Sequence, residues 1–245
     1  MVITTNIFSE YELYEKHFAE FPTLKLSYFQ KWAIKAIVDG DHSLITAHTG
    51  SGKTLPAEFA IKYFVKQGKK VIYTTPVKAL SNTKLHDLRK KYPEISFGII
   101  TGDISENPDA DVLIMTTEIL PATILAQRGN TNTTETDPDA NKCVPLAFEM
   151  DFKNDLAAVV FDEVHYINDP DRGHVWEQAI MLLPPHVQLI MLSATIDKPE
   201  IFANWVETEK NKQATQQHLP EKTLYLSSTN NRCVPLIHYA WLGAG

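Results

Sequence analysis

Two glycines, a lysine and a threonine stand close together in the run AHTGSGKT, residues 47–54. Glycines let the backbone curl so that its N–H groups point inward and form an anion-binding nest, which the start of a helix reinforces. A lysine at this point reaches the β- and γ-phosphates of a nucleotide, and the threonine hydroxyl binds Mg²⁺. Because the run follows a predicted strand and opens a predicted helix, it predicts a P-loop that binds ATP–Mg²⁺; the alternative is a glycine-rich turn with an incidental Lys-Thr pair. The predicted nucleotide-binding residues of this run are His48, Thr49, Gly50, Ser51, Gly52, Lys53 and Thr54.

A second polar run, DEVH at residues 162–165, follows the apolar stretch Leu156–Phe161. A carboxylate that leaves the carboxyl end of a buried strand lies where α/β sheets bind their ligands. Asp162 is therefore predicted to bind Mg²⁺ together with Thr54, and Glu163 to orient and deprotonate the attacking water. Alone, the run would be an ordinary acidic strand end, but a P-loop in the same chain favours the catalytic interpretation. The predicted catalytic residues are Lys53, Asp162, Glu163 and His165.

The third run is Ser193-Ala194-Thr195, which follows the apolar stretch Leu189–Leu192. Small hydroxyl side chains at a strand end can hydrogen-bond the acidic run and respond to the phosphate state. These three residues are therefore predicted to couple the ATP site to the rest of the molecule. A capping turn is the alternative for so common a tripeptide. Its order after the other two runs is what favours the coupling role.

The elements that must position these runs read as strands alternating with amphipathic helices. Several of the strands are apolar throughout, as expected when both faces of a sheet are buried. The predicted fold class is α/β, with a parallel sheet and helices on both faces. The predicted strands are Ser43–Ala47, Lys70–Thr75, Phe97–Thr101, Val112–Thr116, Ala157–Asp162 and Gln188–Ser193, and the predicted helices include Leu55–Gln67, Ala79–Lys91 and Val175–Leu183.

Length, charge and cysteine content limit the possible classes of protein. A chain of 245 residues can hold one large domain or two small ones. The net charge of -7 argues against a general polyanion binder, so any nucleic-acid contact must be local. Two cysteines, Cys143 and Cys233, make neither a disulfide framework nor a metal cluster. With no signal peptide and no apolar run long enough for a bilayer, we expect an intracellular protein, cytoplasmic or nuclear, that is neither secreted nor in a membrane.

Three segments are predicted along the chain. Residues 1–40 form an N-terminal helical segment, 41–227 the ATP-binding domain, and 228–245 the start of a linker. Within the domain, Gly129–Lys142 is polar without apolar periodicity and is predicted to be a weakly ordered surface insertion. A functional insertion is the alternative. A second polar stretch, Glu207–Lys222, is predicted to join the last core helix to a final strand near Thr223–Ser227.

The ordered set of the three runs resembles the signature of superfamily-two DExH-box helicases. Further runs resemble those of the Ski-like (superkiller-type) RNA helicases, from about Leu26 to Tyr239. They are TPVKALSN at 75–82, TGD at 101–103, NPDA at 107–110, LIMTTEIL at 113–120, YIND at 166–169, Arg172-Gly173, Trp176-Glu177 and VPLIHY at 234–239. The resemblance implies the N-terminal, RecA-like P-loop NTPase lobe of an ATP-dependent RNA helicase. In that family, ATP hydrolysis drives 3′-to-5′ movement along single-stranded RNA, often feeding an exonuclease complex.

The resemblance also implies roles for residues outside the three runs. Gln30 would hydrogen-bond the adenine edge, with Leu24 at a position that is often aromatic in the family and Phe21 nearby. The residues along the RNA path would be Pro76, Lys78, Gly102, Asp103, Thr117 and Glu118. Hydroxyls, loop amides and helix N-termini bind phosphates without reading sequence. Asp103 is better suited to ordering its loop, since carboxylate and phosphate repel, and an ordinary turn or helix cap is the alternative for each residue.

One part of the family pattern is missing from the chain. We find no Gln-x-x-Gly-Arg-x-Gly-Arg run, which in these helicases supplies arginine fingers from a second RecA-like lobe. The resemblance therefore implies a second lobe as a partner, in cis or in trans. Because those charges complete transition-state stabilisation, we expect the chain alone to bind ATP–Mg²⁺, hydrolyse it slowly and not unwind duplexes.

Two other functions are compatible with the same runs. One is a DNA helicase of the related repair branch, against which the VKALSN and NPDA runs favour RNA. The other is a nucleotide-gated nucleic-acid-binding module, against which the complete set of catalytic side chains counts.

Overall fold

The computed structural model describes residues 1–132, 148, 150–194 and 196–229. In this part of the chain one nine-stranded sheet has the order β1-β9-β2-β8-β7-β3-β6-β4-β5. All neighbouring strands are parallel except β4 and β5. The strands are β1 (Val2–Ile3), β2 (His42–Ala47), β3 (Lys70–Thr75), β4 (Phe97–Ile100), β5 (Ser105–Glu106), β6 (Val112–Thr116), β7 (Leu156–Phe161), β8 (Gln188–Ser193) and β9 (Leu224–Thr229).

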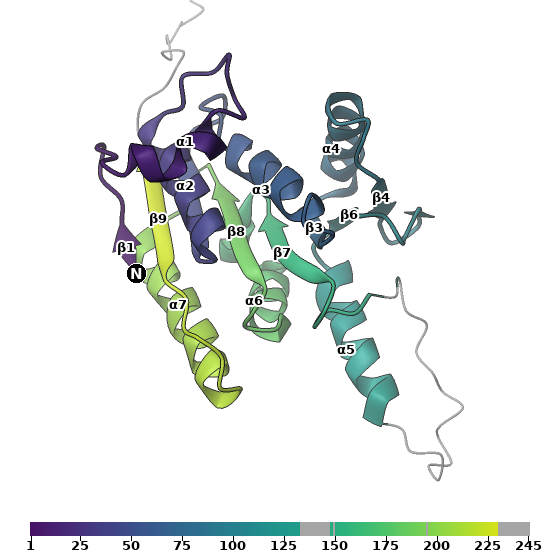
Figure 1. Cartoon of the computed structure of the whole chain (residues 1–245). Coiled ribbons are helices and arrows are strands. Elements are labelled where there is room, and N and C mark those ends of the chain that lie inside the picture. The colour runs from purple at the N-terminus through teal and green to yellow at the C-terminus, as the bar shows by residue number, and fades with distance from the viewer. Residues whose placement is uncertain (133–147, 149, 195, 230–245) are drawn as a thin grey trace, which may run out of the picture.

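Helices cover both faces of this sheet (Figure 1). Consecutive residues of a strand point to opposite faces, so Ile45 joins one apolar cluster and Leu44 the other. The first cluster contains side chains of α1 (Tyr11–Phe18), α2 (Tyr28–Asp39), α3 (Leu55–Val65) and α4 (Lys78–Lys91). The second contains side chains of α5 (Ile119–Asn132), α6 (Gly173–Leu182) and α7 (Pro199–Gln216). The predicted α/β class, with a parallel sheet between two layers of helices, is confirmed.

All six core strands and the three helices predicted above are present, with end points that differ by at most a few residues. Pro56 lies in the first turn of α3, where its missing N–H removes no helical hydrogen bond. The N-terminal segment contains the helices α1 and α2 and the short strand β1. None of the helices in the described residues combines the length and apolar character that crossing a bilayer requires.

Two polar stretches are more helical than predicted. The segment Glu207–Lys222 is not wholly a connector, because α7 continues to Gln216. Likewise, α5 continues to Asn132, so the first residues of the predicted insertion 129–142 are helical, and residues 133–147 lie outside the described part of the chain. The final strand β9 ends at Thr229, past the predicted boundary at 227, and residues 230–245 also lie outside it.

A buried lysine explains why α7 is hard to recognise. Its inward positions include Ala203, Val206, Lys210 and Ala214, so apolar periodicity fails in its second half. Lys210 is 1% exposed and its Nζ donates to the carbonyls of Ile180 (3.2 Å) and Leu183 (2.6 Å) and to Gln213 Oε1 (2.8 Å). These carbonyls belong to the end of α6, where helical partners are lacking. Burial lowers the pKa of Lys210 to about 7.

Candidate active site

The carboxyl ends of the parallel strands bring the predicted runs to one edge of the sheet. The P-loop follows β2, the acidic run follows β7, and Ser193 ends β8. In the sheet, β8 lies between β2 and β7, with Thr46 opposite Ser193 and Phe161 opposite Met191. The P-loop is therefore a neighbour in space of two runs that follow it by more than a hundred residues.

The P-loop has the backbone that an anion nest requires. Gly50 and Gly52 have φ angles of 83° and 84°, a region that glycine enters at no steric cost. The Ser51 N–H and Oγ both donate to the carbonyl of His48, at 3.1 and 2.6 Å, which closes the turn. Thr54 then occupies the position before the first residue of α3, with no side-chain capping hydrogen bond.

Lys53 and Glu163 form an ion pair in the structure. Lys53 Nζ lies 2.9 Å from both carboxylate oxygens of Glu163, and the lysine is 7% exposed. Glu163 has a φ of 51°, unusual for a residue with a side chain, immediately before the 3-10 helix η1 (Val164–Asn168). His165 Nδ1 lies 3.4 Å from Glu163 Oε2. Three of the four predicted catalytic side chains are thus in direct proximity.

The fourth, Asp162, lies beside this pair with its carboxylate held on both oxygens. Oδ1 accepts the N–H of Glu163 at 3.0 Å, and Oδ2 accepts the hydroxyl of Tyr73 at 2.7 Å. Lys84 Nζ lies 3.8 Å from Oδ2. Neither Tyr73 nor Lys84 is a candidate from the sequence, because a tyrosine in an apolar strand and a lysine in a helix are ordinary residues in such places.

This set of groups fits a nucleotide phosphate with Mg²⁺. A Cβ built on Gly50 would meet nothing within 4 Å, so the nest is open toward solvent. A buried ammonium, a hydroxyl and a carboxylate are the donors and ligands that a phosphate-bound Mg²⁺ site uses. The residues that would hold the ion are Thr54 and Asp162.

Gln30 is buried at the back of the P-loop. Its Nε2 donates to the carbonyl of Gly52 at 3.1 Å, and its Oε1 accepts the N–H and the hydroxyl of Ser27, both at 2.9 Å. A Cβ on Gly52 would lie 2.7 Å from that Nε2, so a side chain there would displace the Gln30 amide and strain the backbone at a φ of 84°. Phe21, Leu24 and Ser27 help to line an adjoining cavity of about 650 Å³. The adenine contact stays a prediction, since the geometry shows Gln30 bracing the P-loop.

The predicted nucleic-acid residues fall into exposed and buried groups. Lys78, the first residue of α4, forms an ion pair with Asp103, which also accepts the hydroxyl of Thr101 at 3.0 Å. Those two donors hold the pKa of the Asp103 carboxyl below its usual value. Gly102 and Glu118 are exposed as well. Asp103 thus contacts Lys78 and Thr101, and its part in nucleic-acid binding stays a prediction.

Pro76 and Thr117 have buried side chains. The Thr117 N–H and hydroxyl both donate to the carbonyl of Thr75, at 3.0 and 3.1 Å, which joins the ends of β6 and β3. Arg172 Nη2 donates to the carbonyl of Pro76 at 2.9 Å and lies 3.5 Å from Glu118 Oε2. From the sequence, Arg172 is recognised only as part of a run that resembles the Ski-like helicases. Its link between Pro76 and Glu118 depends on contacts between distant residues.

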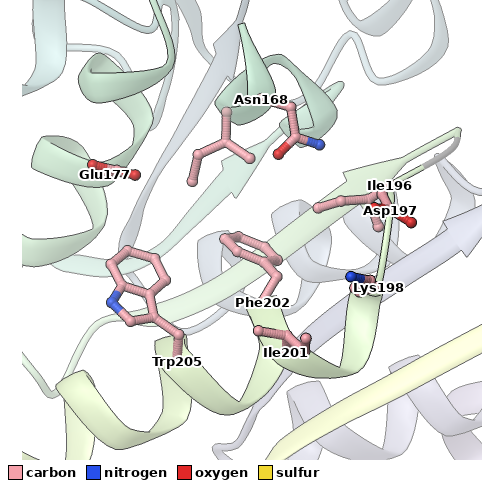
Figure 2. A pocket seen from close by; sticks show the side chains of 9 residues that line it. Asn168, Glu177, Ile196, Asp197, Lys198, Ile201, Phe202 and Trp205 are labelled. Carbon is pink, nitrogen blue, oxygen red and sulfur yellow. The ribbon is translucent and has the colours of Figure 1, made fainter. Parts of the chain in front are cut away.

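The run at the end of β8 approaches the loop after the acidic run. Ser193 is buried, and no described residue hydrogen-bonds its Oγ; Ala194 is half-buried, and Thr195 lies outside the described residues. Beyond them, Ile196 and Asp197 line a cavity of about 340 Å³ with Asn168 of η1 (Figure 2). Figure 2 shows Phe202 and Trp205 of α7 on the opposite wall and Glu177 of α6 to one side.

Gly173 lets α6 approach that loop, and replacing it should destabilise the protein. A Cβ on Gly173 would lie 2.2 Å from the carbonyl oxygen of Ile167, a backbone atom that cannot move aside alone. We expect Gly173→Ala to lower the free energy of unfolding by about 1–3 kcal/mol, measured by urea denaturation. Gly102→Ala is the control, because its Cβ would meet nothing within 4 Å. Equal denaturation midpoints for the two variants would contradict this account of the packing.

Comparison with known proteins identifies the family. Residues 27–202 match the DEAD/DEAH box helicase family. The chain belongs to this family. The prediction of a superfamily-two DExH helicase lobe is therefore confirmed.

Among relatives of this helicase lobe, the antiviral helicase SKI2 of Saccharomyces cerevisiae is 41% identical over 217 residues, which cover 89% of this chain and 14% of SKI2. Superkiller complex protein 2 of Homo sapiens is 40% identical over 215 residues, 88% of this chain and 14% of that protein. The exosome RNA helicase MTR4 of Homo sapiens is 35% identical over 226 residues, 92% of this chain and 18% of MTR4. The chain thus spans a small part of the length of these relatives.

A solved structure supports the fold. The DUF1998 helicase MrfA bound to DNA superposes with a TM-score of 0.60 at 21% identity, covering 88% of this chain and 29% of MrfA. At that level of identity the likeness concerns the fold.

Proposed function

We propose that this chain is the ATP-binding lobe of an RNA helicase that couples ATP hydrolysis to 3′-to-5′ movement on single-stranded RNA. The observation that carries the proposal is the convergence of Lys53, Glu163 and Asp162 at one sheet edge, beside strand ends that carry the nucleic-acid residues. The relatives named superkiller and exosome RNA helicase favour RNA over DNA.

The ion pair suggests how the lobe uses ATP. The γ-phosphate competes with Glu163 for the ammonium of Lys53, since both are anions that bind it by charge-assisted hydrogen bonds. Once released, the Glu163 carboxylate is free to orient the attacking water and take its proton. Thr54 and Asp162 would hold a Mg²⁺ ion, which would supply positive charge to the phosphate oxygens. His165 Nδ1 lies 3.4 Å from the Glu163 carboxylate, close enough to contact it once the ion pair with Lys53 is broken.

The nucleic-acid path in this proposal follows the loops after β3, β4 and β6. Lys78 and the start of α4 contact phosphate oxygens, and Gly102 offers a backbone amide. Pro76 and Thr117 shape the strand ends in this proposal, because proline has no N–H and the Thr117 N–H and hydroxyl both donate to Thr75. Asp103 orders the loop that carries Gly102. Glu118 acts through Arg172, which ties it to Pro76.

Removing the Lys78 ammonium should weaken RNA binding without affecting nucleotide binding. Losing one phosphate contact on a single strand reduces the slope of log affinity against log salt by about 0.7. At 0.1 M salt this corresponds to a loss of about fivefold in RNA affinity. We expect this for Lys78→Ala, measured by fluorescence anisotropy with a labelled oligo(U). Lys69→Ala is the control, because Lys69 lies just before β3, at the opposite end of the strand. A salt slope unchanged in Lys78→Ala would contradict the assignment.

Domain organisation in the proposal keeps an N-terminal segment to residue 40, this lobe, and a linker toward a second RecA-like lobe in cis or trans. That lobe would supply the arginine charges, and an exonuclease complex would be a further partner.

We expect the 245-residue chain to bind ATP, turn it over slowly and leave duplexes intact. Unwinding of an RNA duplex with a 3′ overhang by the purified chain would contradict the one-lobe account.

A further inference from the structure

Asp162 is held in place by a residue from another strand. The hydroxyl of Tyr73, on β3, donates to Asp162 Oδ2 at 2.7 Å, while Oδ1 accepts the N–H of Glu163 at 3.0 Å. With one donor on each oxygen, the carboxylate cannot rotate about its last bond without losing a hydrogen bond. Each oxygen still has lone-pair capacity for the water ligands of a metal ion.

The tyrosine that holds the carboxylate is itself fixed on both sides. Tyr73 is fully buried, and in the sheet it lies opposite Val160 of β7 and Ile114 of β6. Lys84 Nζ lies 5.3 Å from the centre of its ring and 3.8 Å from Asp162 Oδ2.

We propose that Tyr73 is a positioning residue for Mg²⁺ binding. Its hydroxyl fixes the Asp162 carboxylate in the orientation in which it binds the hydrated ion. The inference rests on the proposed function, because it assumes that Asp162 faces a nucleotide-bound Mg²⁺. Groups that orient a metal ligand in this way typically contribute about 10- to 100-fold to metal affinity.

A purely structural role for Tyr73 makes a different prediction. A buried tyrosine hydroxyl needs some partner, and its removal would then change stability while the dependence of nucleotide binding on Mg²⁺ stayed the same. Tyr92 provides the comparison within this chain. It is 8% exposed and its hydroxyl donates at 3.0 Å to Glu58 Oε2, a carboxylate that is not among the predicted Mg²⁺ ligands.

The test compares Tyr73→Phe with Tyr92→Phe, since each removes one hydroxyl and retains the ring that packs in the core. Binding of a fluorescent ADP analogue to the 245-residue chain is measured in EDTA and at increasing MgCl₂. We expect Tyr73→Phe to need about tenfold more Mg²⁺ for the half-maximal increase in affinity, with an unchanged Kd in EDTA. Tyr92→Phe should follow the unmutated chain throughout.

Two results would overturn the inference while the proposed function stands. One is a Tyr73→Phe titration that superposes on that of the unmutated chain, and the other is an equal shift in both variants. If the unmutated chain binds ADP neither with nor without Mg²⁺, the proposed function fails first and the inference with it.

Discussion

Glu163→Gln should lower the rate of ATP hydrolysis by about 100-fold or more and leave ATP binding intact. The amide keeps the shape of the side chain but cannot accept the proton of the attacking water, and general-base catalysis is worth about 10²- to 10⁴-fold. The ion pair adds a second expectation. Without its carboxylate partner 2.9 Å away, Lys53 is free for phosphate, so ATP should bind at least as tightly as before.

Hydrolysis is best followed by single-turnover kinetics in a longer form that carries a second RecA-like lobe, because turnover by this lobe alone is expected to be slow. ATP binding is measured by titration of the 245-residue chain. Glu94→Gln is the control, since Glu94 is exposed on the loop after α4. A variant that hydrolyses ATP at the unmutated rate would show that Glu163 is not the general base and would favour a nucleotide-gated binding module.

Lys53→Met should weaken ATP binding by about 100-fold or more. The methionine retains most of the length of the side chain and removes the charge, and losing one partner of a desolvated charge contact costs about 2–5 kcal/mol. Lys53 is largely desolvated, because only 7% of the residue is exposed. In this variant the Glu163 carboxylate would lose its ion pair with Lys53, and His165 would remain 3.4 Å from it. Repulsion between the unpaired carboxylate and the phosphates would weaken ATP binding further.

The measurement is equilibrium titration of the 245-residue chain with a fluorescent ATP analogue in the presence of Mg²⁺. Lys212→Met serves as the control, because Lys212 is an exposed residue of α7. Affinities for Lys53→Met and Lys212→Met that agree within a factor of two would rule out phosphate binding by Lys53. Read with Glu163→Gln, the pair of variants separates binding from chemistry: one change removes affinity and the other removes turnover.

Local sequence patterns predict the fold class and most elements, because strands buried on both faces of a parallel sheet read as short apolar runs. The glycine-rich run after the first of these strands predicts the P-loop. The same patterns place Lys53 and Asp162 at strand ends, and parallel strands bring such ends to one edge. Two helical stretches escaped prediction. The second half of α7 has Lys210 facing inward, which breaks apolar periodicity, and the end of α5 is polar.

Contacts between distant residues could not be read from the sequence. The Lys53–Glu163 ion pair and the hydrogen bond from Tyr73 to Asp162 join positions 110 and 89 residues apart. A tyrosine in a buried strand gives no indication from the sequence that its hydroxyl contacts Asp162. In the same way, the burial of Thr117 follows from the meeting of β6 and β3, not from the residues around it.

The most direct test of the central claim is steady-state ATP hydrolysis with single-stranded RNA, with single-stranded DNA, and without nucleic acid. It compares the 245-residue chain with a longer form that carries the second lobe. An RNA helicase lobe predicts slow, unstimulated turnover by the chain and strong stimulation of the longer form by RNA. Equal stimulation by DNA, or no turnover in either form, would contradict it.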